Sequence, residues 1–283
     1  FTERVVTYNP GGALSGAENL AVAGTTAYVC CARGLAVVDI ADPLAPNLVE
    51  IVEMNKPTSV AVQFRYAFVT DADGLKVVDV TVPAKAKQVG DTYPVADARN
   101  VYVAREYAYV AAGAEGVMFV DITVPTKLRA VIDPQEEMAN PGAAKPLPPF
   151  DAGGRLRDVN MVRIGMVNDS VYAMVADGQT GLHVLQVVTP MDGGRSAYGF
   201  SPSPRPRWIA NYPARGARAI ARGLDRDRAA DESGNQVSVF GRIGGRPFTL
   251  EEQRRFYMRA NGEVYRVSDA VPKDWKPEKM TKK

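Results

Sequence analysis

The residues best placed for chemistry are carboxylates that recur at one position of a repeating pattern. Asp39, Asp79 and Asp121 stand 40 and 42 residues apart, and Gln186 occupies the fourth corresponding position. A carboxylate can exchange a proton, bind a cation or accept hydrogen bonds from the amides of a following turn. Gln186 favours the last role, because an amide oxygen accepts a hydrogen bond but does not act as an acid or base. We therefore expect a structural role at all four positions and no catalytic residue among them.

Metal-binding side chains are too few for a zinc site. The sequence has one histidine, His183, and two adjacent cysteines, Cys30 and Cys31, and it contains no Cys-x-x-Cys-His for covalent haem. Residues 71–74 (Asp-Ala-Asp-Gly) begin like a calcium loop, but the twelfth position, Val82, lacks the required carboxylate. We expect no resident metal and no cofactor, and a calcium-dependent adhesion module remains an alternative.

Arginine is concentrated in the C-terminal part of the chain. Residues 205–266 hold 13 arginines and 7 acidic residues, whereas residues 1–204 hold 16 basic and 22 acidic ones. The planar guanidinium suits carboxylates, so this region favours an acidic protein partner, a solvated salt-bridged face being the alternative. Nucleic acid is not expected, because the net charge is only +2 and aromatic residues do not alternate with the basic ones. The predicted partner-binding residues are Arg205, Arg207, Arg215, Arg218, Arg222 and Trp275.

The elements that position these residues are short repeated strands. Four matching blocks begin at Gly34, Gly74, Gly116 and Gly181, the first reading GLAVVDIADP and the second GLKVVDVTVP. Alternating apolar runs precede each block and another follows its proline, which gives about four strands per unit. A unit of about 40 residues with four strands is typical of a β-propeller blade.

The repeats predict an all-β propeller over residues 1–270, with five blades, or six as the alternative, and a basic tail at 271–283. The clear blades span 19–52, 58–92, 98–132 and 156–212. A degraded fifth blade at 215–268 would be closed by the strand 3–8, which would remove the free edges of the ring. Proline-rich insertions at about 133–155 and 190–206 are interpreted as surface arms or as tolerated insertions without a role.

A second hypothesis places an active site in the central channel. Asp97 and Asp158 come just before predicted inner strands, close to Arg99 and Arg157. Two carboxylates about 5–10 Å apart are the groups that a glycoside hydrolase requires. A channel-sited hydrolase or lyase therefore predicts that Asp97 and Asp158 converge.

The blocks Leu35–Asp39, Leu75–Asp79 and Val117–Asp121 resemble the LVIVD repeat of bacterial and archaeal β-propellers. The resemblance is good over residues 1–190 and weak beyond them. It implies a secreted or cell-surface propeller with a binding or scaffolding role, such as an accessory partner of a multihaem cytochrome or of a surface filament. The family shares no catalytic motif, so the resemblance transfers no catalytic residue.

Composition and the chain start agree with an exported globular protein. The chain has 283 residues, of which 46% are hydrophobic and 23% charged, and this excludes a disordered class. No stretch approaches the roughly 18 consecutive apolar residues of a membrane helix. We interpret the start at Phe1 as the result of signal removal, with a truncated chain as the alternative. The expected location is the periplasm, the extracellular space or the cell surface.

Overall fold

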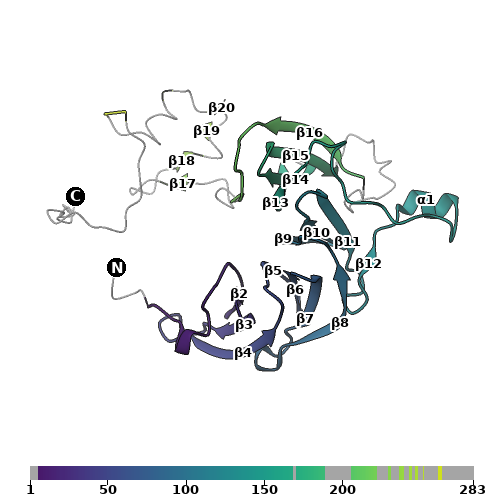
Figure 1. The fold of residues 1–283 in the computed structure, drawn as a ribbon. Coiled ribbons are helices and arrows are strands. Elements are labelled where there is room, and N and C mark those ends of the chain that lie inside the picture. The colour runs from purple at the N-terminus through teal and green to yellow at the C-terminus, as the bar shows by residue number, and fades with distance from the viewer. Residues whose placement is uncertain are drawn as a thin grey trace. The chain divides into compact units, whose positions relative to one another are not determined.

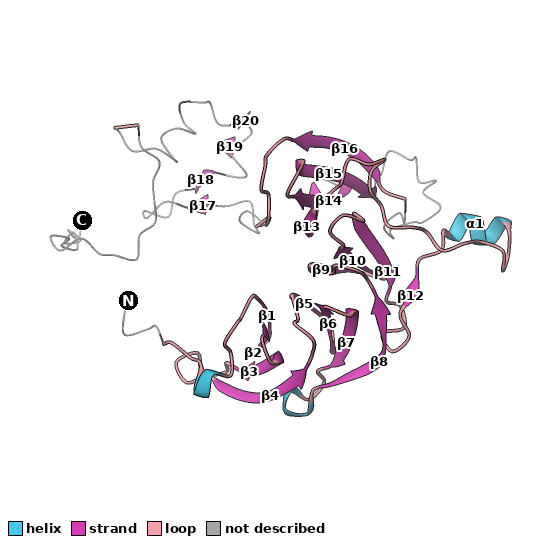
Figure 2. Cartoon of the chain, in the orientation of Figure 1, coloured by secondary structure: helices cyan, strands magenta, loops and turns pink. Residues whose placement is uncertain are grey.

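Four sheets of four antiparallel strands follow one another along the chain. The computed structural model describes residues 6–167, 170–188 and 205–221, together with 229–230, 236–238, 242–243, 246–247, 251 and 261–262. In each sheet the strands lie in chain order, so that each blade is a simple meander. Figure 1 and Figure 2 show the sheets arranged around a common centre, with the first strand of each nearest that centre. The predicted all-β propeller is confirmed.

The strand bounds follow the predicted repeats closely. Blade 1 comprises β1 (Asn19–Ala23), β2 (Thr26–Cys31), β3 (Gly34–Asp39) and β4 (Asn47–Glu53). Blade 2 comprises β5 (Ser59–Gln63), β6 (Tyr66–Asp71), β7 (Gly74–Asp79) and β8 (Lys87–Pro94). Blade 3 comprises β9 (Asn100–Ala104), β10 (Tyr107–Ala111), β11 (Val117–Asp121) and β12 (Arg129–Ala130). Blade 4 comprises β13 (Val159–Val167), β14 (Ser170–Asp177), β15 (Gly181–Val188) and β16 (Arg207–Tyr212).

The remaining elements are short. Two 3-10 turns, Pro10–Gly12 and Pro83–Lys85, and one helix, α1 (Pro134–Ala139), lie within the first compact unit, Phe1–Ile220. The described strands of the second unit, Ala221–Lys283, are β17 (Ala229–Ala230), β18 (Gln236–Ser238), β19 (Arg242–Ile243) and β20 (Arg246–Pro247). They form two antiparallel pairs, β17 with β18 and β19 with β20. No described helix is long and apolar enough to cross a membrane.

The predicted fifth blade stays a prediction. Most of residues 215–268 and half of the closing strand 3–8 lie outside the described residues, as does the tail 271–283. Within the described part, residues 6–8 form no strand, and the Tyr8 hydroxyl accepts a hydrogen bond from the Leu48 amide at 2.5 Å.

The repeated glycine is required by a close approach between the third and fourth strands. Gly74 has a φ of +137°, and a Cβ placed on it would lie 2.2 Å from the Tyr93 carbonyl oxygen. Both the backbone angle and the contact exclude a side chain at this position. Gly34 and Gly181, the first residues of β3 and β15, would meet a fourth-strand carbonyl in the same way, at 2.2 Å. In blade 3, Gly116 lies just before β11, and its added Cβ would meet the Phe150 carbonyl at 2.3 Å.

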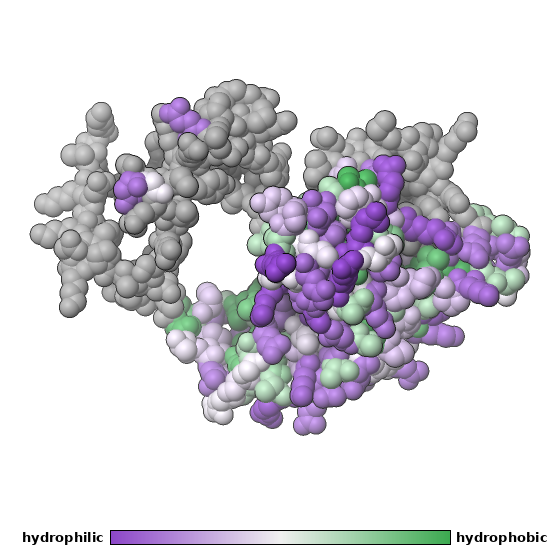
Figure 3. All heavy atoms as spheres, turned by 45° about the horizontal axis from the view of Figure 1, so that its top comes forward, coloured by the Kyte–Doolittle hydropathy of each residue, from purple (hydrophilic) through white to green (hydrophobic). Residues whose placement is uncertain are grey.

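The hydrophobic core lies between neighbouring blades. Tyr28 of blade 1 clusters with Val69 of blade 2, Phe68 of blade 2 with Val110 of blade 3, and Tyr109 of blade 3 with Val175 of blade 4. A middle strand is therefore buried on both faces, which explains why β3 is a continuous apolar run up to Asp39 and why β7 is buried from Gly74 to Val78, including Lys76. Figure 3 shows mainly hydrophilic residues over the visible face of the described part, with apolar residues scattered among them.

Side-chain amides join the inner strands of successive blades. Asn19 accepts a hydrogen bond from the Val60 amide at 3.1 Å, and Asn100 accepts one from the Val162 amide at 3.2 Å. Asn100 also donates to the Ser59 hydroxyl at 2.9 Å. These bonds satisfy edge groups of the inner strands that would otherwise be unpaired.

The first proline-rich insertion interrupts the outer strand of blade 3. Phe150 pairs with Val117 of β11, so the outer edge resumes after the insertion, and Ile132 forms a bridge with Pro146. Helix α1 projects from the blade between these two points, as Figure 1 shows. The insertion is therefore an arm built into a blade and not a linker between blades.

Candidate functional site

The repeated aspartates bind the turn that follows the third strand. Asp39, Asp79 and Asp121 each accept a hydrogen bond from the backbone amide two residues later, at 2.9, 2.9 and 2.8 Å. Hydrogen bonds from Thr81 hold the pKa of the Asp79 carboxyl below its ordinary value. A carboxylate in this role fixes the turn between the third and fourth strands.

Asp97 and Asp158 converge on one guanidinium, that of Arg99. Nε of Arg99 lies 2.9 Å from Oδ1 of Asp97, and Nη2 lies 2.5 Å from Oδ2 of the same residue. Nη1 lies 2.6 Å from Oδ1 of Asp158 and 2.7 Å from Oδ1 of Asn160. These residues precede or begin the inner strands of blades 3 and 4. Arg99, Asp158 and Asn160 line a polar pocket of about 480 Å³ together with Gly178, Gly216 and Arg218.

This cluster suits a clamp between blades better than acid–base chemistry. The hydrogen bonds that Arg99 donates to Asp97, and to a lesser extent those to Asp158, raise the pKa of Arg99 above its ordinary value against the opposing effect of burial. Both carboxylates are ion-paired with the same guanidinium, an arrangement that joins two blades and differs from the two free carboxyl groups that flank the substrate of a glycosidase. Arg157 stands apart, since its side chain donates to the Gly154 carbonyl at 3.0 Å.

The calcium-like segment 71–74 is occupied by an ammonium group. Nζ of Lys76 lies 2.5 Å from Oδ2 of Asp71 and 2.7 Å from Oδ2 of Asp73. Asp71, which is fully buried, also accepts the amides of Asp73 and Gly74 at 2.9 and 3.2 Å. The lysine supplies the positive charge that a cation would bring, and the described residues contain no group of three or more metal ligands.

His183 and the two cysteines are buried within blades. Nδ1 of His183 accepts a hydrogen bond from the Trp208 indole at 3.1 Å, and Nε2 lies 2.8 Å from the Thr180 hydroxyl. Burial lowers the pKa of His183. Cys30 and Cys31 are both buried free thiols, and burial raises the pKa of Cys30 to about 12, so this thiol is unreactive at neutral pH.

Of the predicted partner-binding residues, two arginines are engaged within the first unit. Arg205 pairs with Asp133 at 2.5 Å and with Glu136 at 2.9 Å, which ties the arm of blade 3 to the segment leading into β16. Arg207 donates to Oε1 of Gln186 at 2.8 Å, so Gln186 binds a guanidinium where the repeated aspartates bind a turn.

The other predicted partner-binding residues divide between surface and undescribed positions. Arg215 and Arg218 are exposed and form no salt bridge with any other described residue. Arg222 and Trp275 lie outside the described residues. The positions of these four residues do not bear on the docking hypothesis.

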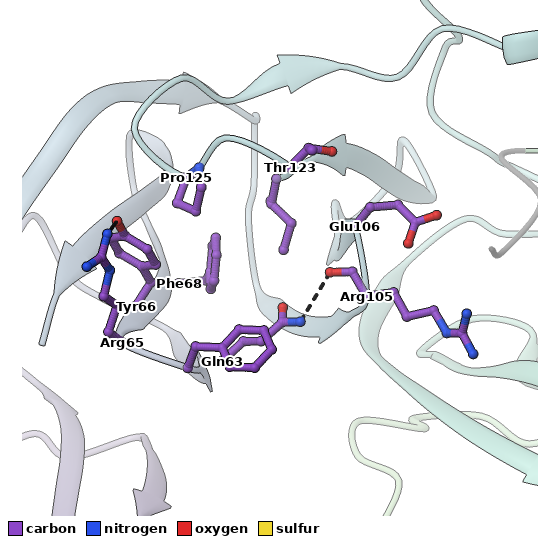
Figure 4. A pocket seen from close by; sticks show the side chains of 10 residues that line it. Gln63, Arg65, Tyr66, Phe68, Arg105, Glu106, Thr123 and Pro125 are labelled. Atoms are coloured by element: carbon purple, nitrogen blue, oxygen red, sulfur yellow. Dashed lines mark hydrogen bonds between the residues drawn. The ribbon is translucent and has the colours of Figure 1, made fainter. Parts of the chain in front are cut away.

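A mainly apolar cleft of about 650 Å³ opens between blades 2 and 3, at the end that carries the turns between first and second strands. Phe68 and Ile122, both almost fully buried, belong to the core cluster between these blades and form part of its wall. Figure 4 shows Phe68 next to Tyr66 and Pro125. It also shows the hydrogen bond that the Gln63 side chain donates to the Arg105 carbonyl at 3.2 Å.

An exposed aromatic ring stands on the turn at the rim of this cleft. Phe64 is 93% exposed, the highest value among the large apolar residues described, and its φ is +54°. The matching turn position is Gly24 in blade 1, at φ +60°, where the absence of a Cβ avoids strain, and Arg105 in blade 3, at φ +56°. A bulky residue in this backbone region costs about 1–2 kcal/mol, and Phe64 recovers none of it by burial.

Sequence reasoning did not single out Phe64. The signal was present, because Phe64-Arg65 joins two strands of blade 2 just as Gly24-Thr25 joins those of blade 1. An aromatic residue in a two-residue turn whose first position favours glycine is unusual enough to mark a candidate binding residue.

Arg65 is oriented over the wall of the cleft by an aromatic ring. Its guanidinium carbon lies 5.2 Å from the centre of the Tyr66 ring, and Nη2 donates to the Tyr66 hydroxyl at 3.1 Å. The charge therefore stands at the rim in a defined position without a salt bridge to another described residue.

The family model that matches this sequence is the LVIVD repeat, and it matches three times, at residues 16–54, 56–90 and 96–132. These ranges are blades 1, 2 and 3. The chain carries LVIVD repeats. Blade 4 has the same four-stranded meander, but the family model does not match it. Its sequence differs from the other blades at Gln186, and its first three strands are longer. No curated protein matches the chain.

Solved structures with similar folds have low sequence identity to this LVIVD-repeat chain. A functionally unknown protein from Desulfotomaculum acetoxidans DSM 771 is 11% identical, with 72% of this chain and 58% of that chain covered and a TM-score of 0.49. Citrobacter koseri AztD is 13% identical, with 71% and 48% covered and a TM-score of 0.39. The β-propeller domain of Myceliophteria thermophila Cps50 (Swd1) is 11% identical, with 61% and 52% covered and a TM-score of 0.38. The match thus spans about half the length of each of these structures.

Proposed function

We propose that this LVIVD-repeat propeller is a non-enzymatic interaction module, exported to the periplasm or the cell surface, that docks on another protein. The observation that carries the proposal is Phe64, an almost fully exposed ring on a strained turn at the rim of an apolar cleft. Aromatic residues beside pockets are the usual anchors of protein interfaces. Strain without an internal compensation is typical of a residue that acts on a ligand.

The non-enzymatic part of the proposal rests on how the candidate acids are held. Asp97 and Asp158 share the charge of Arg99, and Asp71 and Asp73 share that of Lys76. These groups stabilise turns and blade contacts, so a hydrolase and a calcium-dependent adhesion module are both less well supported than a docking surface.

The finer proposal names the partner as a multihaem cytochrome or a surface filament, following the role that the LVIVD resemblance implies. A haem protein would be recognisable by colour, because this sequence has no Cys-x-x-Cys-His motif to hold covalent haem itself. Export is tested separately, by fractionating the native cells and locating the protein in the periplasmic or surface fraction.

The deciding experiment is purification of the protein from its native source, with its mass and visible spectrum measured. We expect a complex larger than 30.5 kDa, and a haem Soret band if the partner is a cytochrome. The Phe64→Gly variant should release the partner, whereas Leu44→Ser, which removes an exposed apolar residue from another loop, should retain it. A colourless monomer of 30.5 kDa would overturn the proposal, and a colourless complex would remove only the cytochrome.

A further inference from the structure

We infer that the cleft between blades 2 and 3 binds an apolar side chain of a partner protein that carries a carboxylate one or two residues away. The inference rests on the proposed function and assigns the partner chemistry of that site. Three features carry it: the apolar wall, the exposed Phe64 ring and the oriented charge of Arg65.

The shape and lining of the cleft select an apolar anchor. Its volume of about 650 Å³ exceeds what one large side chain needs, and Phe68 and Ile122 present the end of the core between the blades to it. Phe64 adds a ring at the rim that an incoming side chain can cover, removing both apolar surfaces from water. The hydrogen bond from Gln63 to the Arg105 carbonyl links the two turns and fixes the width of the opening.

The charge at the rim selects a carboxylate beside that anchor. Arg65 retains guanidinium donors that no described residue uses in a salt bridge, and its stacking on Tyr66 fixes where they lie. Asp79 interacts electrostatically with Arg65, but its carboxyl accepts both the amide and the hydroxyl of Thr81 and forms no salt bridge with Arg65 among the described residues.

The opposite rim adds a mixed pair, Arg105 and Glu106. Figure 4 shows both side chains extending to the side away from Arg65. The charged residues that line the cleft are therefore two arginines, Arg65 and Arg105, and one glutamate, Glu106, and this excess of positive charge suits an acidic group.

The test uses the full-length, isotope-labelled protein and two blocked peptides, acetyl-Gly-Phe-Asp-Gly-amide and its neutral counterpart acetyl-Gly-Phe-Asn-Gly-amide. We expect saturable NMR shifts at residues 63–68, 105–106 and 122–125, with dissociation constants in the millimolar range of about 1–10 mM. The aspartate peptide should bind about threefold to tenfold more tightly. No saturable shift at these residues, or shifts elsewhere only, would overturn the assignment.

Two variants separate the two halves of the inference. Phe64→Gly should weaken both peptides by about tenfold or more, without lowering the melting temperature, because Gly24 occupies the matching position of blade 1. Arg65→Met keeps an apolar contact with Tyr66 and should make the two peptides bind equally. Equal binding of both peptides to the unaltered protein would refute the carboxylate, and Leu44→Ser serves as the unchanged control.

The peptide test fails or succeeds independently of the interaction module. A native complex that survives Phe64→Gly would leave the proposed function standing and remove the cleft from it. If the protein binds the peptides but is a monomer in its native source, the cleft assignment stands and the proposed function falls.

Discussion

The Tyr109 hydroxyl is buried in the core between blades 3 and 4 without a hydrogen-bond partner among the described residues. Burial raises the pKa of Tyr109 above its ordinary value, which reflects the same loss of solvation. The matching residue of blade 2 is Phe68, whose ring packs equally well without a hydroxyl. The matching residue of blade 1, Tyr28, has a hydroxyl hydrogen-bonded to Thr26.

These environments predict opposite effects of the same substitution. Tyr109→Phe should raise the free energy of unfolding by about 1 kcal/mol, because it removes a buried polar group that has no partner. Tyr28→Phe should lower it by about 1 kcal/mol, because it removes a satisfied one. Urea unfolding of the two variants measures both changes, and an equal loss in each would show that the Tyr109 hydroxyl is satisfied in solution.

His183 gives the stability of the protein a defined pH dependence. Its Nδ1 accepts a hydrogen bond from the Trp208 indole N–H, and this indole can only donate. Protonation of the His183 ring would add a hydrogen to Nδ1, so that two N–H donors would face each other. Burial, opposed in part by Asp177, lowers the pKa of His183 below the value of about 6.5 that the unfolded chain has. Below that pH the unfolded state binds a proton that the folded state does not, so stability falls as the pH decreases.

The sequence has one histidine, which isolates this effect. We expect the melting temperature to fall as the pH is lowered from about 7 to about 5. His183→Gln should be less stable at pH 7 but should show a flatter profile over the same range. Scanning calorimetry of both proteins checks this, and parallel profiles would assign the pH dependence to other groups.

At the scale of one element, the glycine that opens each third strand supports a specific prediction. Gly74→Ala should lower the free energy of unfolding by at least about 2 kcal/mol, because its Cβ would collide with the Tyr93 carbonyl. Gly24→Ala is the matched control. It also has a positive φ, but no atom lies within 4 Å of the added Cβ, so a loss of about 1 kcal/mol is expected. Similar losses in the two variants would show that backbone angle alone decides the cost.

The strands were predictable because their determinants are local. The glycine, the apolar run and the aspartate (Gln186 in blade 4) of each repeated block lie within ten residues, and the structure places β3, β7, β11 and β15 on those blocks. Arg99 was noted in the sequence, but its contacts with Asp158 and Asn160 were not predicted, since they join residues 59 and 61 positions apart. Such contacts depend on how adjacent blades meet, and the repeat period alone does not specify this.

The cleft was missed for the same reason. Phe64 belongs to one blade, whereas Arg105 and Ile122 belong to the next, so only the packed pair of blades creates the site. Asp71 and Lys76 illustrate a different limit. The sequence suggested a calcium loop there, and the pairing with lysine becomes evident only when β6 and β7 are placed side by side.

At the scale of the whole molecule, one contact extends the pattern of the blades beyond the fourth. Asn19 and Asn100 bind an inner-strand amide of another blade, and the Met161 sulfur accepts the Ile220 amide at 3.2 Å in a comparable way. Ile220 thus occupies the place that Val60 and Val162 hold in described blades. The fifth blade at 215–268 stays a prediction.

Because the core clusters lie between blades, damage to one cluster should reach two blades. Phe68→Ala should lower the free energy of unfolding by about 3–5 kcal/mol by opening a cavity in the cluster that blades 2 and 3 share. Hydrogen exchange should then accelerate in both β5–β7 and β9–β11, and less in β13–β15. Leu185→Ala, in the cluster between blades 3 and 4, should instead accelerate blades 3 and 4. Acceleration confined to blade 2 in Phe68→Ala would mean that each sheet is stabilised within itself. In the predicted pattern, the interface between two neighbouring blades is the unit that unfolds together. The cleft lies at one of these interfaces, between blades 2 and 3.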